Sequence, residues 1–253
     1  MLQSRQVGLS VVKAQCPRRR LMDRAGNTVL EVVYPEGDKL RARRVVSRSR
    51  ARPTGKYPSW KMQRMVQWES HNELNAYRLL DATPDVKAYH EQPIMLRYVL
   101  DGEEHRHYPD VLVEYRNSRE LWEIKPTSQA LDPWYVARTR FLQATLPELG
   151  FNYRMVLAEE LAMQPRLNTV LTLLKHGRTP VSDLIREQVR RYFNAVDSVT
   201  WSHAAIIEVE AAGRDVFARL LLEGDLSCDM DQALEPTTPL WLANAQAKDG
   251  GRT

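Results

Sequence analysis

Residues 108–125 read YPDVLVEYRNSRELWEIK, which we interpret as two strands joined by a tight turn at Asn117-Ser118. The side chains of a strand alternate between its two faces, so Glu123 and Lys125 share one face of the second strand. The turn folds the second strand back along the first, which places Asp110, at the start of the first strand, beside the end of the second. The stretch therefore predicts that Asp110, Glu123 and Lys125 meet at one corner of a sheet.

These three side chains suit the hydrolysis of phosphodiester bonds. Carboxylate oxygens are ligands that Mg²⁺ accepts, and the metal neutralises the scissile phosphate and helps to make hydroxide at neutral pH. A lysine beside them adds a compact positive charge that orients the water or stabilises the developing negative charge. A Glu-x-Lys pair on a strand face is common without any catalytic role, but the Pro109-Asp110 pair upstream favours the catalytic interpretation.

A third acid is expected from the segment before these strands. Glu69 and Glu73 are four positions apart, so they share one face of a helix, and either of them can supply a metal ligand. The spacing does not choose between them. It also fits two solvated glutamates, or a glutamate that caps the helix locally.

The surrounding pattern predicts a mixed α/β fold in the order helix, three-strand meander, helix, strand. Ser59 is the expected cap of the first helix, and Pro84 ends it. Asp101-Gly102 is a two-residue turn signal after the first strand, and Gly150 closes the second helix. The predicted elements are helices over 59–80 and 133–148 and strands over 94–100, 108–115, 120–125 and 151–157.

Charge and texture divide the chain into three predicted parts. Residues 1–57 form a basic arm with one predicted strand at 28–34, residues 58–160 form the catalytic domain, and residues 161–253 form a mainly helical, winged-helix-like domain. Between Lys39 and Arg64 the chain carries ten Lys or Arg and no Asp or Glu, which fits a polyanionic partner such as nucleic acid and fits a solvated basic linker equally well. The residues expected to contact DNA phosphates are Arg41, Arg43, Arg44, Arg48, Arg50, Arg52, Lys56 and Lys61.

The composition excludes several classes of protein. A hydrophobic fraction of 43% and a charged fraction of 27% over 253 residues are ordinary for a globular protein. No apolar run is long enough to span a membrane, and the first residues lack the apolar core of a secretory signal. Cys16 and Cys228 lie far apart in the sequence, so we expect no disulfide, no zinc site and a reducing cytoplasm.

Two further motif searches bear on function. No phosphate-binding loop and no covalent-nucleophile motif occurs, so we expect neither ATP binding nor a covalent enzyme intermediate. His105-Arg106-His107 could form a metal clip, but without a third ligand nearby we interpret it as a hairpin tip near DNA, with Arg106 reaching a phosphate.

Over about residues 40–160 the chain resembles the TnsA-type endonuclease subunits of heteromeric cut-and-paste transposases. The residues that carry the resemblance are Tyr57-Pro58-Ser59-Trp60-Lys61, Trp68-Glu69-Ser70 with Glu73 and Leu74, Pro84-Asp85-Val86, Glu91-Gln92-Pro93, Tyr108-Pro109-Asp110 and Glu123-Ile124-Lys125. The ordered set is specific, although each piece alone is not.

The resemblance implies a restriction-endonuclease-like fold of the PD-(D/E)xK class. It implies that Glu73, rather than Glu69, joins Asp110 and Glu123 in binding one or two Mg²⁺ ions, for which Mn²⁺ could substitute. Lys125 is then the catalytic lysine, the main-chain carbonyl of Ile124 is a further metal ligand, and Gln92 supports the site.

The resemblance also implies a biological task. Proteins of this type cut the non-transferred strand at the 5′ side of each transposon end, while a separate DDE-type (TnsB-like) transposase subunit cuts the 3′ side. An ATP-dependent (TnsC-like) regulator contacts the complex, and no membrane is involved. Two alternatives remain open at this stage: a restriction or repair nuclease of the same fold, and a DNA-binding adaptor whose acids are catalytically inactive.

Overall fold

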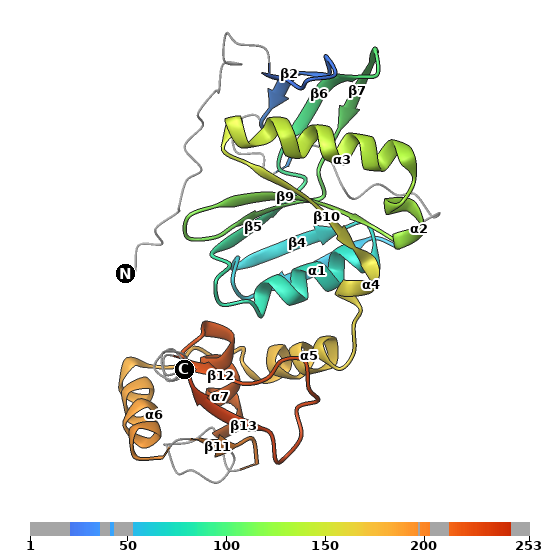
Figure 1. Cartoon of the computed structure of the whole chain (residues 1–253). Coiled ribbons are helices and arrows are strands. Elements are labelled where there is room, and N and C mark those ends of the chain that lie inside the picture. Colours follow the sequence, from blue (N-terminus) through green and yellow to red (C-terminus); the bar gives the residue numbers. More distant parts are fainter. Residues whose placement is uncertain (1–20, 36–40, 43–52, 197, 203–212, 244–253) are drawn as a thin grey trace, which may run out of the picture.

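The computed structural model of the chain describes residues 21–35, 41–42, 53–196, 198–202 and 213–243. It has a mixed α/β fold in which one lobe contains the larger sheets, while a second lobe contains the C-terminal helices and a small sheet (Figure 1). No helix within those ranges combines the length and the apolar character needed to cross a bilayer.

The central sheet has four strands in the order β10-β9-β8-β5. The strands β5, β8 and β9 pair antiparallel with one another in that order. The strand β10 lies parallel to β9, because the helical segment between them crosses back over the sheet. One face packs on α1 and the other on α3, so inward side chains alternate along β8 and β9 between two hydrophobic clusters. The elements are α1 (His71–Asp81), β5 (Ala88–Glu91), β8 (Val111–Glu114), β9 (Arg119–Lys125), α3 (Pro133–Thr145) and β10 (Asn152–Leu157).

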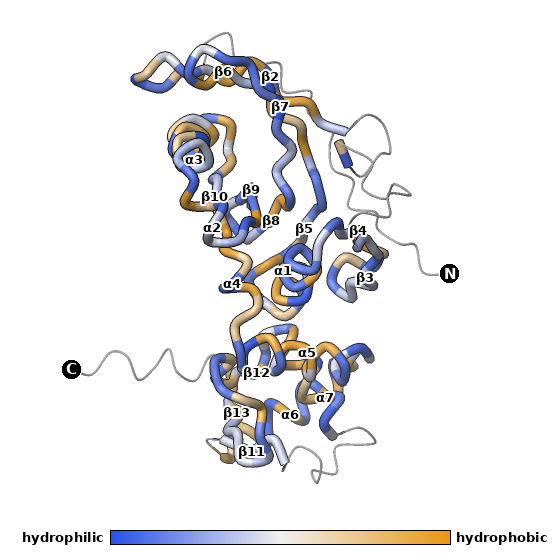
Figure 2. The backbone as a smooth tube through the Cα atoms, turned by 90° about the vertical axis from the view of Figure 1, so that its right-hand side faces the viewer, coloured by the Kyte–Doolittle hydropathy of each residue, from blue (hydrophilic) through white to orange (hydrophobic). Residues whose placement is uncertain are grey.

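A long bent hairpin connects this sheet to a second one. Its outer half is β6 (Met95–Leu100) and β7 (Glu103–His107), which pair in the second sheet in the order β1-β2-β6-β7 (Figure 2). The bend lies where Gln92 donates its backbone N–H to the Asp110 carbonyl at 2.9 Å. The hairpin closes at Asp101-Gly102, where both residues have positive φ, as a tight two-residue turn requires. The remaining strands are β1 (Leu21–Met22) and β2 (Thr28–Val33).

The meander therefore differs from the one expected. The strand predicted over 94–100 exists as β6, but it lies in the second sheet, and β5 takes its place beside β8. The strand at 28–34 is confirmed as β2, and the strand at 151–157 is confirmed as β10. The helix over 133–148 is confirmed as α3, followed by the 3₁₀ turn η1 (Leu146–Leu149).

The first predicted helix is wrong over its N-terminal half. Residues before Ser70 form the hairpin of β3 (Gly55–Ser59) and β4 (Arg64–Trp68), and the helix begins only after Ser70. Burial along β3 alternates, with Tyr57 and Ser59 inward and Pro58 outward, which is strand periodicity. The Ser70 hydroxyl accepts the backbone N–H of Glu73 at 3.2 Å, so this serine, not Ser59, is the N-cap.

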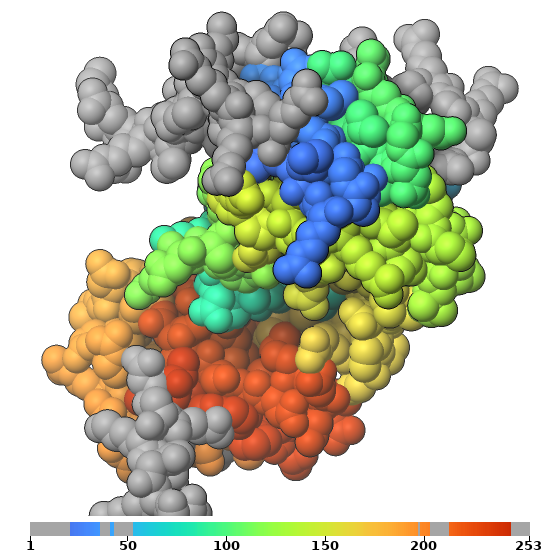
Figure 3. All heavy atoms as spheres, turned by 45° about the horizontal axis from the view of Figure 1, so that its top comes forward, coloured from blue at the N-terminus to red at the C-terminus, as the bar shows by residue number. Residues whose placement is uncertain are grey.

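The C-terminal lobe has its own hydrophobic cluster, built around Phe193, Trp201, Phe217 and Leu240. Three helices pack around a small sheet in the order β11-β13-β12, and α5 also packs against α1 of the first lobe. Figure 3 shows these elements, mostly orange to red, gathered beneath those of the first lobe. Cys228 is a buried free thiol in the C-terminal lobe, whereas Cys16 lies outside the described residues. The elements are α5 (Arg166–His176), α6 (Asp183–Ala195), β11 (Val199–Thr200), α7 (Gly213–Glu223), β12 (Leu226–Ser227) and β13 (Pro239–Leu242). The short helix α4 (Ala158–Leu161) precedes them and packs on α1 and β10 of the first lobe.

A buried carboxylate joins three elements of the first lobe. Asp81, at the end of α1, is fully buried and accepts hydrogen bonds from the hydroxyls of Tyr57 at 2.8 Å, Ser59 at 2.7 Å and Tyr89 at 3.0 Å. These donors come from β3 and β5, so one side chain fixes the β3–β4 hairpin and the central sheet to α1.

Replacing Asp81 with alanine should leave these buried hydroxyls without their acceptor. We expect the free energy of unfolding to fall by about 2–4 kcal/mol, because a buried polar group that loses its partner keeps its desolvation cost. Urea denaturation followed by circular dichroism measures this change. Asp85→Ala is the matched control, since Asp85 is exposed, and equal midpoints for the two variants would contradict the structural role of Asp81.

Candidate active site

Asp110 occupies the position directly before β8 and faces the end of β9. Its backbone N–H bonds to the Trp122 carbonyl at 2.9 Å, and its Oδ2 accepts the backbone N–H of Ile124 at 2.7 Å. Because Val111 pairs with Trp122 in the antiparallel ladder, the next position brings Asp110 opposite Glu123. The structure thus brings Asp110 to the corner that the sequence indicated.

Glu123 and Lys125 lie on the same face of β9, as strand alternation requires. The Lys125 ammonium lies 2.8 Å from Glu123 Oε1 and 3.4 Å from the Ile124 carbonyl oxygen. Glu123 is buried, whereas Lys125 is half-buried and close enough to solvent to meet a ligand. The lysine therefore contacts two of the oxygen groups that were expected to bind metal.

Arg138 of α3 is a member of this site that the sequence did not reveal. Its Nη2 donates to Glu123 Oε1 at 2.9 Å, and its side chain is buried under the rings of Trp134 and Tyr135, at 4.8 and 4.9 Å. Burial by itself would raise the pKa of Glu123, but the neighbouring His107, Lys125 and Arg138 outweigh that effect and hold the pKa below its usual value. Arg138 therefore keeps a buried glutamate ionised.

His107 is a second residue that belongs here, against our expectation. The segment 105–107 is not a hairpin tip: it lies in β7, and the turn itself is Asp101-Gly102. His107 Nε2 lies 3.1 Å from the Tyr153 hydroxyl and 3.4 Å from Glu123 Oε2. Burial lowers the pKa of His107 to about 3, so its ring is neutral near pH 7. Arg106 is exposed on the same strand.

Glu73 approaches the site from the N-terminus of α1. Its Oε2 accepts the backbone N–H of Glu69 at 2.8 Å, and its Oε1 accepts the Ser70 hydroxyl at 3.2 Å. Burial raises the pKa of Glu73 to about 7. Gln92 supports this end of the helix, because its side-chain amide donates to Glu69 Oε2 at 3.0 Å. Both Glu73 oxygens thus bond at the start of α1, while the charge of Glu73 acts on Asp110.

The carboxylates repel one another. The pKa of Asp110 is held well above its usual value, first by burial and then by the negative charges of Glu123 and Glu73. Lys125 and Arg138 provide two positive charges against these three acids, so without a metal the cluster favours protonated carboxyl groups. A bound cation would allow all three carboxylates to ionise together.

A divalent cation fits this donor set. Glu123 Oε2 is buried without a hydrogen bond, and Asp110 and the Ile124 carbonyl lie beside it. In the ranges that the structure describes, no three His, Cys, Asp or Glu side chains already stand as a complete metal-binding group. Both oxygens of Glu73 accept hydrogen bonds at the start of α1.

The expected DNA-contacting residues are only partly described. Arg43, Arg44, Arg48, Arg50 and Arg52 lie outside the described residues. Arg41 Nη1 lies 3.6 Å from Glu91, and Lys56 is exposed on β3. Lys61 instead donates to the carbonyls of Leu80 at 2.9 Å and Thr83 at 2.5 Å, which caps the end of α1. Its assignment to DNA stays a prediction.

Glu73 should make the metal-free protein less stable as the pH rises. The folded state holds this proton more tightly than the unfolded chain, because the pKa rises from 4.5 to about 7. The resulting stabilisation is complete below pH 4.5 and is lost as the pH passes through about 7. Between these pH values we expect the unfolding free energy of Glu73→Gln to fall by about 1–3 kcal/mol less than that of the wild type. Urea denaturation in EDTA across this pH range measures the difference.

The matched control for this measurement is Glu160→Gln, which removes the same charge from an exposed position on α4. If the two variants show the same dependence of unfolding free energy on pH, Glu73 does not hold a proton in the folded protein.

The comparisons with known proteins agree with this geometry. No curated protein matches the chain. Residues 83–157 match the family model described as the TnsA-like endonuclease N-terminal domain. The matched segment contains Asp110, Glu123, Lys125 and Arg138, while Glu73 lies just before it. The chain therefore carries a TnsA-like endonuclease domain over these residues.

Proposed function

We propose that the chain is a Mg²⁺-dependent DNA endonuclease that acts at transposon ends. The observation that carries the proposal is the corner formed by Asp110, Glu123 and Lys125, with the Ile124 N–H on Asp110 Oδ2 at 2.7 Å and the lysine ammonium on Glu123 Oε1 at 2.8 Å. Acids and an amine at this spacing are the groups that metal-assisted phosphodiester hydrolysis needs.

In this proposal Asp110, Glu123 and the Ile124 carbonyl bind one or two Mg²⁺ ions, with Glu73 as the third carboxylate. The metal would neutralise the scissile phosphate and lower the pKa of a water molecule. Lys125 orients that water or stabilises the charge that develops on the phosphate. Arg138 and the Lys125 ammonium keep the Glu123 carboxylate oriented and ionised. Hydrolysis then leaves a 5′-phosphate and a 3′-hydroxyl.

The finer fold assignment belongs to the same proposal. We infer a restriction-endonuclease-like core within residues 58–160, a basic arm over 1–57 and a winged-helix-like domain over 161–253. The strand order β11-β13-β12, with helices before and between these strands, supports the last assignment. The arginines of the arm are proposed to bind the phosphates that flank the cleavage site.

The proposed substrate is the non-transferred strand at the 5′ side of the element. A DDE-type transposase subunit is proposed to cut the other strand, and an ATP-dependent regulator to contact the assembly. This division of labour rests on the family match and not on any described contact.

Strand-specific nicking tests the proposal. A duplex that contains a transposon end, with each strand labelled separately, is incubated with the chain and Mg²⁺, alone and together with the transposase and the regulator. We expect cuts in the non-transferred strand only, and only in the complete mixture. Cleavage by the isolated chain would favour a restriction or repair nuclease, and a complete mixture that never cuts this strand would favour an inactive adaptor.

A further inference from the structure

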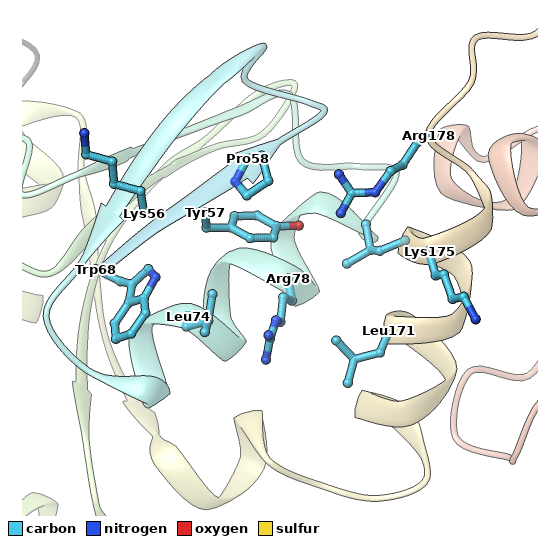
Figure 4. A pocket seen from close by; sticks show the side chains of 10 residues that line it. Lys56, Tyr57, Pro58, Trp68, Leu74, Arg78, Leu171, Lys175 and Arg178 are labelled. Atoms are coloured by element: carbon cyan, nitrogen blue, oxygen red, sulfur yellow. The ribbon is translucent and has the colours of Figure 1, made fainter. Parts of the chain in front are cut away.

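A cavity of about 400 Å³ lies between the two lobes, and none of Glu73, Asp110, Glu123 and Lys125 lines it (Figure 4). Its walls come from β3, β4 and α1 on one side and from α5 on the other. Every charged side chain that lines it is positive, and the four are Lys56, Arg78, Lys175 and Arg178. The proposed function assigns a role to none of them except Lys56.

These four cations have no acidic partner within the described part of the chain. None of them takes part in an ion pair, whereas Arg64, Arg138 and Arg186 are all paired with glutamates. Of the four, only Arg78 makes a side-chain hydrogen bond within the described residues, to the Asn75 amide oxygen at 3.1 Å. Four like charges around one opening repel one another, so the opening is complementary to an anionic ligand.

The interior of the cavity is apolar and not suited to a nucleobase. Pro58, Leu74, Leu171 and Leu174 provide aliphatic surface. Trp68 is not available as a stacking platform: a Cβ on Gly55 would lie 2.4 Å from its ring, so the glycine packs directly on it, and the His71 ring lies 5.4 Å away. Tyr57 is buried and bonded to Asp81. Single-stranded DNA binds through free aromatic faces, which this cavity lacks.

We propose that this cavity binds a short acidic peptide with an apolar anchor residue, supplied by another protein. The carboxylates would pair with the cations at the opening, and a leucine-sized side chain would fill the aliphatic interior. A DNA duplex presents phosphates but no apolar group, so it would leave the leucines uncovered. The buried Trp68 indole N–H, which has no acceptor, offers one more donor to such a peptide.

Neither end of the chain supplies a suitable occupant. Residues 1–20 contain five basic side chains and no acid, and residues 244–253 contain two basic side chains and one acid. The occupant would contact Leu74, the neighbour of Glu73 on α1. A peptide bound here would therefore touch the helix that carries one of the proposed metal ligands.

Fluorescence anisotropy on the full chain tests this proposal without any cleavage. The probe is a short fluorescein-labelled peptide of alternating leucine and glutamate, compared with versions in which serine replaces leucine or lysine replaces glutamate. We expect only the leucine–glutamate peptide to bind. Arg178→Glu, Lys175→Glu and Leu171→Ser should each weaken its binding about tenfold.

Lys87→Glu is the control, because Lys87 is an exposed lysine outside the cavity and its replacement changes the net charge equally. Thermal unfolding shows whether Leu171→Ser stays folded. The substitutions at Lys175 and Arg178, which are exposed, leave the apolar interior unchanged. The proposal would be overturned if the serine peptide bound as tightly as the leucine–glutamate peptide, or if the leucine–glutamate peptide did not bind. It would also be overturned if Lys87→Glu weakened binding as much as the cavity variants do. Loss of affinity for a labelled DNA duplex in the same variants, without peptide binding, would assign the cavity to DNA instead.

Discussion

Asp110→Asn should abolish cleavage of the non-transferred strand while the protein stays folded. The amide keeps an oxygen that can accept the Ile124 N–H, but it removes a negative charge from the proposed metal site. We expect the rate of cleavage to fall by about a thousandfold or more, since the metal supplies most of the electrostatic stabilisation of the reaction. End-labelled duplex cleaved in the assembled complex gives this rate.

Stability distinguishes a lost ligand from a damaged fold. In EDTA, the unfolding free energy of Asp110→Asn should stay within about 1 kcal/mol of the wild type, because the repulsion by Glu123 and Glu73 is removed along with the charge. Glu114→Gln is the matched control, a carboxylate at the other end of β8. Cleavage at the wild-type rate by Asp110→Asn would refute the assignment, and so would equal loss in both variants.

Lys125→Gln should separate catalysis from metal binding. The ammonium lies on Glu123 Oε1 and near the Ile124 carbonyl, so removing it takes a competing positive charge away from two proposed metal ligands. We expect cleavage to fall by about a hundredfold, while the affinity for Mn²⁺ stays the same or increases. Calorimetric titration with Mn²⁺ and the strand-cleavage assay measure the two quantities.

The control for this variant is Lys87→Gln, which removes an exposed lysine elsewhere and should change neither quantity. A Lys125→Gln protein that loses both cleavage and Mn²⁺ affinity would show that the lysine maintains the site and does not act on the substrate.

Local patterns predicted the active-site corner because its geometry follows from strand rules. Alternation along 119–125 and the turn at Asn117-Ser118 are enough to bring Asp110, Glu123 and Lys125 together. The same kind of reasoning failed at residues 59–68, where apolar residues three and four positions apart looked helical. There the chain makes a hairpin, because Tyr57 and Ser59 bury their hydroxyls on Asp81, a tertiary contact that periodicity does not show.

Long-range partners account for the site residues that were missed. Arg138 lies on a helix where an arginine normally faces solvent, and only the packing of α3 over the sheet buries it against Glu123. His107 was misassigned because the bend at Gln92 and Asp110 continues the hairpin into a second sheet, which turns this ring inward. Neither residue carries a local signal for its role.

The location of a bound metal tests the central claim most directly. Crystals of the full chain grown with Mn²⁺, measured at a wavelength where manganese scatters anomalously, reveal each ion by itself. The account predicts a peak bonded to the Asp110 and Glu123 carboxylates and the Ile124 carbonyl, close to the Lys125 ammonium. Ordered manganese bound elsewhere, with none at this corner under saturating Mn²⁺, would contradict it.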